Sequence, residues 1–64
     1  MITVTFFAGD GMSFTETEYP YTDAGVIMAH IDMINHIRAG GYCLAEYGNN
    51  AVMVSEVAQV EMTA

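Results

Sequence analysis

Carboxylates are the side chains of this sequence best placed to do chemistry. The chain of 64 residues has eight Asp or Glu residues against a single Lys or Arg, which gives a formal charge of −7. Glu16 and Glu18 stand two residues apart in an alternating segment, so on a strand they project from one face, about 7 Å apart. That separation resembles the roughly 7 Å between successive phosphates of a nucleic-acid strand. We therefore expect a carboxylate row that binds cations on another macromolecule.

Other chemistry has weaker support in the residues. His30 and His36 are six residues apart, so on a helix they point to different faces, unlike the four-residue spacing by which two histidines share a metal. Cys43 is the only cysteine, and a reactive thiol needs an electropositive setting that this acidic chain does not provide. Paired carboxylates would need a substrate cleft, which one sheet with one helix rarely encloses. We expect no enzymatic activity, no metal site and no cofactor.

The charge also restricts the partners. Direct binding to nucleic acid or to an anionic membrane needs clustered Lys and Arg, so neither is expected. A strongly negative field speeds encounter with a basic surface, although solubility alone is the other explanation of the charge. The single cysteine excludes an internal disulfide, and neither a signal peptide nor an apolar run of membrane-spanning length is evident. A cytoplasmic protein is predicted.

The elements that position the acidic residues can be read from apolar periodicity. Residues 2–8 alternate β-branched and aromatic types with threonine, which predicts a strand. Gly9-Asp10-Gly11 suits a turn, and residues 13–19 alternate again without a strongly apolar face, which indicates an edge strand or an extended loop. Pro20 ends this segment.

A helix is expected from Thr22 or Asp23 to Arg38, with Gly40-Gly41 ending it. Apolar residues recur in it at intervals of three and four, which predicts the side that packs on the core. The predicted stripe consists of Ile27, His30, Ile31, Ile34 and Ile37, widened by Val26 and Met33.

Residues 42–47 and 51 to about 62 are strand-like and flank Gly48-Asn49-Asn50, which predicts a second hairpin. Its register is open. A two-residue turn at Asn49-Asn50 groups Cys43, Ala45 and Tyr47 with Val52 and Val54, whereas a three-residue loop groups Tyr42 and Leu44 with those valines. After Val54 the alternation weakens, which suggests a bulge or an early strand end. The sum is a single α+β domain, 1–64, with a small antiparallel sheet of three to four strands in ββαββ or βαββ order and one helix on one face.

Small size, acidic balance, a single cysteine and this order of elements resemble the small anti-CRISPR proteins encoded by phages and mobile elements, among them inhibitors of the type I-C surveillance complex, Cascade. The resemblance rests on no diagnostic motif. It implies a stoichiometric inhibitor, a monomer acting in the cytoplasm of the infected bacterial cell, which mimics DNA and covers the basic DNA-binding surface of the complex. The residues placed in these roles are Asp10, Glu16, Glu18, Asp23 and Asp32 as phosphate mimics, with Tyr19 and Tyr21 as apolar anchors.

The competing hypothesis is a small phage structural or antitoxin-like protein that pairs its sheet edge with a partner, its charge serving solubility. A one-sided acidic face beside exposed tyrosines favours mimicry. Even scatter of the carboxylates with an open apolar strand edge favours strand addition.

Overall fold

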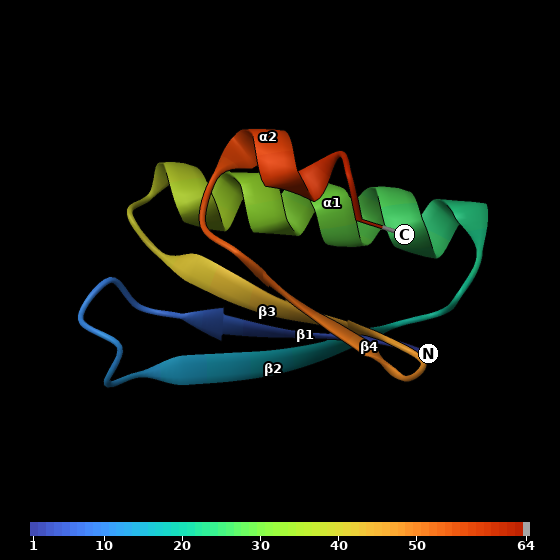
Figure 1. Ribbon diagram of the computed structural model, residues 1–64, viewed down its shortest axis with the longest axis horizontal. Helices are drawn as coiled ribbons and strands as arrows, with labels where there is room; N and C mark the ends of the chain where they lie inside the picture. The colour runs from blue at the N-terminus through green and yellow to red at the C-terminus, as the bar shows by residue number, and fades with distance from the viewer. Residues whose placement is uncertain (64) are drawn as a thin grey trace.

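The computed structural model describes residues 1–63, which form a four-stranded antiparallel sheet with one long helix packed on one face (Figure 1). The elements are β1 (Ile2–Phe7), β2 (Phe14–Tyr19), α1 (Asp23–Arg38), β3 (Tyr42–Tyr47), β4 (Asn50–Val54) and the short α2 (Val57–Val60). The strand order is β2-β1-β3-β4. The predicted α+β class is confirmed, with the longer ββαββ order followed by one short helix.

Strand β1 lies between β2 and β3, and its alternating side chains fix the two faces of the sheet. Ile2 and Val4 are fully buried on the helix side, and Phe6 packs against the same core. β2 is a true strand on the sheet edge, as its weakly apolar pattern suggested, and it ends before Pro20. In β3 and β4, Cys43 lies opposite Val54 and Ala45 opposite Val52.

That pairing decides the register that the sequence left open. Tyr47 lies opposite Asn50, so the turn consists of two residues, Gly48 and Asn49, one position earlier than the Asn49-Asn50 turn considered above. Gly48 has a φ of 59°, the left-handed conformation that such a turn uses. Cys43, Ala45 and Tyr47 therefore share the helix side with Val52 and Val54.

Helix α1 is rotated about its axis from the predicted orientation. Val26, Met33, Ile34 and Ile37 of the predicted stripe contact the core, but Ile27 and Ile31 do not. Ile27 and Ile31 are 58% and 47% exposed, whereas Gly25, Ala29 and Met33 are buried. The reason is close approach: a Cβ at residue 25 would overlap the carbonyl oxygen of Pro20. The small residues therefore mark the contact line, and Ile34 and Ile37 of the predicted stripe pack against the core from its flank.

The signals at the helix ends are confirmed. The Thr22 Oγ1 accepts a hydrogen bond from the Gly25 amide at 3.1 Å, which identifies Thr22 as the N-cap. Gly40 follows the last turn with a φ of 100°.

The chain after Val54 differs from the strand expected to continue to about residue 62. The Gln59 side chain accepts hydrogen bonds from the amides of Ser55 and Glu56, which turns the chain into α2. Val60 is fully buried beside α1. The Thr63 hydroxyl contacts Tyr47 and the His30 ring, each at 3.0 Å, and holds this last segment on the helix layer.

Candidate functional site

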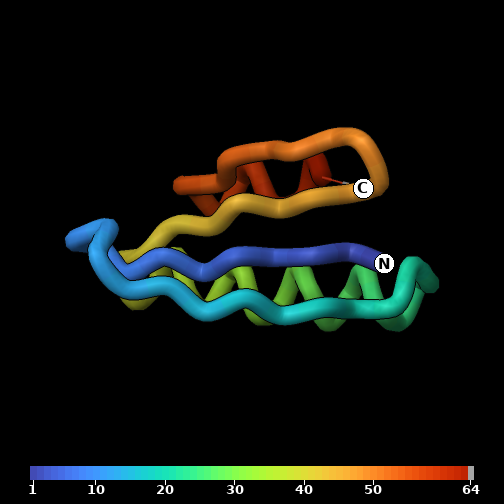
Figure 2. The backbone as a smooth tube through the Cα atoms, turned by 90° about the horizontal axis from the view of Figure 1, so that it is seen from below, coloured from blue at the N-terminus to red at the C-terminus, as the bar shows by residue number. Residues whose placement is uncertain are grey.

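One face of the sheet is not covered by the helices. Seen from below, the four strands lie in front and α1 and α2 lie behind them (Figure 2). The strand pairing places eleven side chains on this uncovered side, which we call the open face. It consists of Thr3, Thr5, Phe7, Phe14, Glu16, Glu18, Tyr42, Leu44, Glu46, Ala51 and Met53.

Three carboxylates occupy one half of the open face. Glu18 and Glu46 lie opposite Thr3, one on each side of it, and Glu16 lies two residues from Glu18 along β2. Strand geometry gives about 7 Å between Glu16 and Glu18 and about 10 Å between Glu18 and Glu46. These carboxylates form a triangle with no cationic side chain among the eleven residues of the face. Three of the eight acidic residues of the sequence therefore lie on one side of the sheet.

Three aromatic rings occupy the other half. Phe7 lies opposite both Phe14 and Tyr42. The Phe7 and Tyr42 rings are stacked with centroids 5.0 Å apart, and the Phe14 ring lies 6.0 Å from that of Phe7. Phe14 is 67% exposed. A platform of this kind offers apolar area and ring faces to a partner.

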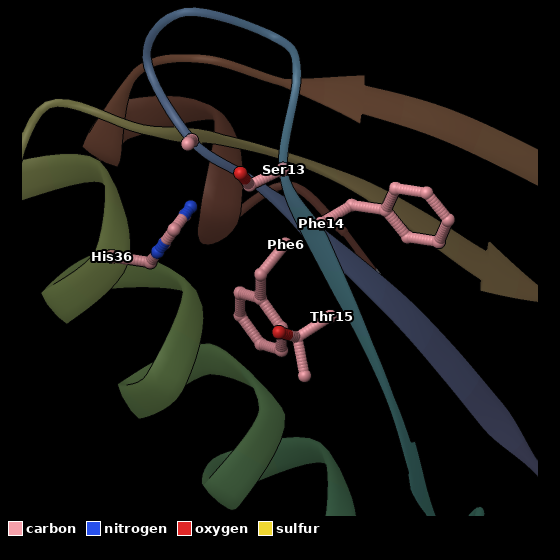
Figure 3. Close-up of a pocket in the computed structure, with 6 residues that line it drawn as sticks. Phe6, Ser13, Phe14, Thr15 and His36 are labelled. Atoms are coloured by element: carbon pink, nitrogen blue, oxygen red, sulfur yellow. The ribbon is translucent and has the colours of Figure 1, made fainter.

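A depression of about 310 Å³ adjoins the aromatic end, on the helix side of β2. In Figure 3, Phe6 and Thr15 lie toward α1, whereas the Phe14 ring points away from His36. The His36 ring lies 2.6 Å from the Phe7 carbonyl oxygen, to which its Nε2–H donates. His36 therefore ties the end of α1 to β1. Within residues 1–63, no three His, Cys, Asp or Glu side chains are grouped so that they could hold a metal ion.

Two of the predicted site residues, Tyr19 and the half-buried Asp32, bond to each other between β2 and α1. Tyr19 is only 6% exposed, and its hydroxyl donates to the Asp32 carboxylate at 2.6 Å. Burial and the nearby Asp32 carboxylate raise the pKa of Tyr19 above its usual value of 10.0. Tyr19 was expected as an apolar anchor and Asp32 as a phosphate mimic. The structure instead buries the Tyr19 ring, and the hydrogen bond between the two side chains joins β2 to α1.

The other predicted residues are exposed but do not form one surface. Asp10 lies in the loop between β1 and β2, where its carboxylate accepts a hydrogen bond from the Met12 amide at 2.9 Å. Asp23 lies in the first turn of α1. Tyr21 is 58% exposed just before that helix and makes an edge contact with the Tyr47 ring, their centroids 6.2 Å apart. The open face thus gathers only Glu16 and Glu18 from the predicted set.

Sequence reasoning missed four residues of the open face, which are Glu46, Phe7, Phe14 and Tyr42. Their signal was present in the alternation of the strands, but it required the register of the second hairpin and the strand order. The carboxylates of Glu56 and Glu61 lie on the helix layer with α2.

Cys43 lies in the core rather than at a site. Its side chain is fully buried, and burial raises the pKa of its thiol to about 11. The thiolate form is therefore scarce at neutral pH.

Comparison with family models, curated proteins and solved structures gives no significant match. In the part of the chain that the structure describes, the helices are too short or too polar to cross a membrane.

Proposed function

We propose that this protein is a stoichiometric binding protein whose open face docks on a basic surface of a partner macromolecule. The observation that carries the proposal is the placing of Glu16, Glu18 and Glu46 beside three aromatic rings on a sheet face that no element of residues 1–63 covers. Monomeric proteins seldom leave such a mixed apolar and charged patch without a use.

The two halves of the open face would contribute differently to binding. The carboxylates attract Arg and Lys at long range and accept charge-assisted hydrogen bonds at contact, which raises the association rate. The rings of Phe14 and Tyr42 bury apolar area and can stack on guanidinium groups, which slows dissociation. Binding by the acidic half should weaken as salt rises.

A DNA-binding surface is the partner that fits best. The separation of Glu16 and Glu18 is close to the phosphate repeat of a nucleic-acid strand, and Glu46 adds a second row about 10 Å away. The resemblance in size, charge and element order to anti-CRISPR proteins suggests a type I surveillance complex, of type I-C, as the target. The protein would then compete with target DNA for that complex in the infected bacterial cell.

The test is a gel-shift titration with purified type I-C complex and a labelled target duplex. We expect the wild-type protein to abolish the shifted band at about one equivalent per binding site. The informative variant is E16K/E18K, and the matched control is E56K/E61K on the helix layer. Each Glu→Lys change adds two charges, so both variants carry −3 instead of −7.

Loss of inhibition in E16K/E18K, with inhibition kept by E56K/E61K, would support docking through the open face. Circular dichroism and urea unfolding must show that both variants fold. Equal inhibition by the two folded variants would contradict the proposal, and so would unchanged DNA binding at a large excess of wild-type protein.

Strand addition at β4 is a second candidate, because this edge differs from the other. Residues 50–54 include no charged side chain, and Val52 and Met53 are 41% and 54% exposed, whereas the β2 edge has Glu16 and Glu18. Charged edges resist pairing and uncharged ones accept it. A complex held by β4 would persist at salt concentrations that release the open face.

A further inference from the structure

Helix α1 has a second apolar stripe on the side away from the sheet. Ala24, Ile27 and Ile31 follow one another at intervals of three and four residues, and Arg38 follows seven residues later, two turns further on. These four residues are the outer stripe. Ile27 and Ile31 are 58% and 47% exposed. Exposed isoleucines on one side of a helix indicate a surface that a partner covers, and within residues 1–63 neither the sheet nor α2 covers Ile27 and Ile31.

The two ends of the outer stripe have opposite charges. Asp23 lies in the first turn of α1, and Arg38, the only Lys or Arg of the sequence, lies in the last turn. They are separated by about 22 Å along the helix axis. A surface that is apolar in the middle, negative at one end and positive at the other is complementary to a copy of itself that runs in the opposite direction.

We propose that α1 is the interface of a two-fold symmetric homodimer, in which two α1 helices pack antiparallel through their outer stripes. Each Ile27 then lies against the partner's Ile31. This register places Arg38 within about 5 Å, along the axis, of the partner's Asp23, a gap that the long arginine side chain spans. Two equivalent ion pairs then close the ends of the interface, as an isologous contact requires.

The high net charge does not oppose this arrangement locally. Glu16, Glu18 and Glu46 lie on the open face, on the opposite side of the sheet from α1, so they point away from the second copy. Asp23 and Arg38 balance each other at the interface itself. The two open faces of the dimer are directed outward in opposite directions, and the inference does not depend on what they bind.

The size of the contact sets its strength. Helix α1 has 16 residues, so the stripe is about 24 Å long and about 10 Å wide. This is well below the roughly 800 Å² that each partner buries in a standard interface. A weak, reversible dimer with a dissociation constant on the order of micromolar to millimolar follows. At high protein concentration, this dimer would replace the monomer that the resemblance to anti-CRISPR proteins implies.

Sedimentation velocity at protein concentrations from about 5 μM to about 1 mM tests the dimer, because the expected dissociation constant lies in this range. We expect the wild-type sedimentation coefficient to rise with concentration. I31E should remain monomeric, whereas M53E, the same change at a similarly exposed apolar residue on the β4 edge, should dimerise as the wild type does. A wild type that stays monomeric throughout, or a dimer abolished by M53E and not by I31E, would overturn the inference.

A charge exchange tests the antiparallel orientation. D23R places two arginines at each end of the dimer, and R38D places two aspartates there, so each variant alone should dimerise at least about tenfold more weakly. Mixing the two restores opposite charges at both ends, and the mixture should form a heterodimer at wild-type concentrations. If the folded variants do not associate on mixing, the proposed orientation is wrong.

Discussion

The three carboxylates of the open face serve binding, but their mutual repulsion should lower the free energy of unfolding. Replacing Glu16, Glu18 and Glu46 by Gln removes three mutual repulsions without removing a hydrogen bond that the structure shows. The separations of about 7, 10 and 12 Å follow from strand geometry. In water each pair then repels by about 0.3 to 0.6 kcal/mol before screening.

Screening sets how this gain varies with salt. The three pairs sum to about 1 kcal/mol at 10 mM salt, about 0.5 kcal/mol at 150 mM, and nearly nothing at 1 M, because the Debye length falls from about 30 to 3 Å. The free energy of unfolding of E16Q/E18Q/E46Q should exceed that of the wild type by these amounts. The midpoint of thermal unfolding at low salt should rise by about 4–8 °C.

Urea unfolding at the three salt concentrations is the assay, and D32N is the control. Asp32 accepts the Tyr19 hydroxyl, so its neutralisation should lower stability by about 1 kcal/mol rather than raise it. A triple variant that is less stable than the wild type, or one whose gain persists at 1 M salt, would refute the reasoning. The carboxylates would then be making structural contacts and could not be reserved for a partner.

Two further predictions concern the core. Gly25→Ala should destabilise the protein by about 1–2 kcal/mol in urea unfolding. The clash of the new Cβ with the Pro20 carbonyl oxygen costs more than the gain of about 1 kcal/mol in helix propensity. A gain in stability would contradict the close approach of Gly25 to Pro20. The Cys43 pKa is raised from 9.0 to about 11 and the Tyr19 pKa is raised above 10.0, so the stability that depends on these protonated groups is complete below pH 9 and is lost as pH rises through 11 and beyond. C43A should remove the first part of this alkaline loss, and an unchanged pH profile in C43A would show that the thiol is not its source.

The strands were predictable from sequence because side chains alternate with a period of two. β1 could be recognised from Ile2 and Val4, and β2 from its alternation and from Pro20 at its end. The helix ends followed from Thr22 and from the glycine pair. These signals are local, and they do not depend on which elements become neighbours.

The contact side of α1 could not be predicted in the same way. Periodicity placed Ile27 and Ile31 on the core stripe, but the approach of Pro20 to Gly25 requires a small residue and so rotates the contact side away from these two isoleucines. The prediction of the candidate site was incomplete for a similar reason. Glu16 and Glu18 were predicted to share a face, whereas the partners of that face, Glu46 and Phe7, depend on strand order. Tyr19 and Asp32 were misplaced because their hydrogen bond joins distant segments.

Strand β1 precedes both of its sheet neighbours in the chain, and one of them, β3, follows only after β2 and α1. β1 pairs with β2 across a short loop, but its other side remains unpaired until residues 42–47 have been made. A hairpin and a helix of this size are marginal by themselves. This segment should therefore stay open until β3 has been made and then close in one cooperative step. A chain cut before Tyr42 would leave one side of β1 unpaired and would yield no folded product.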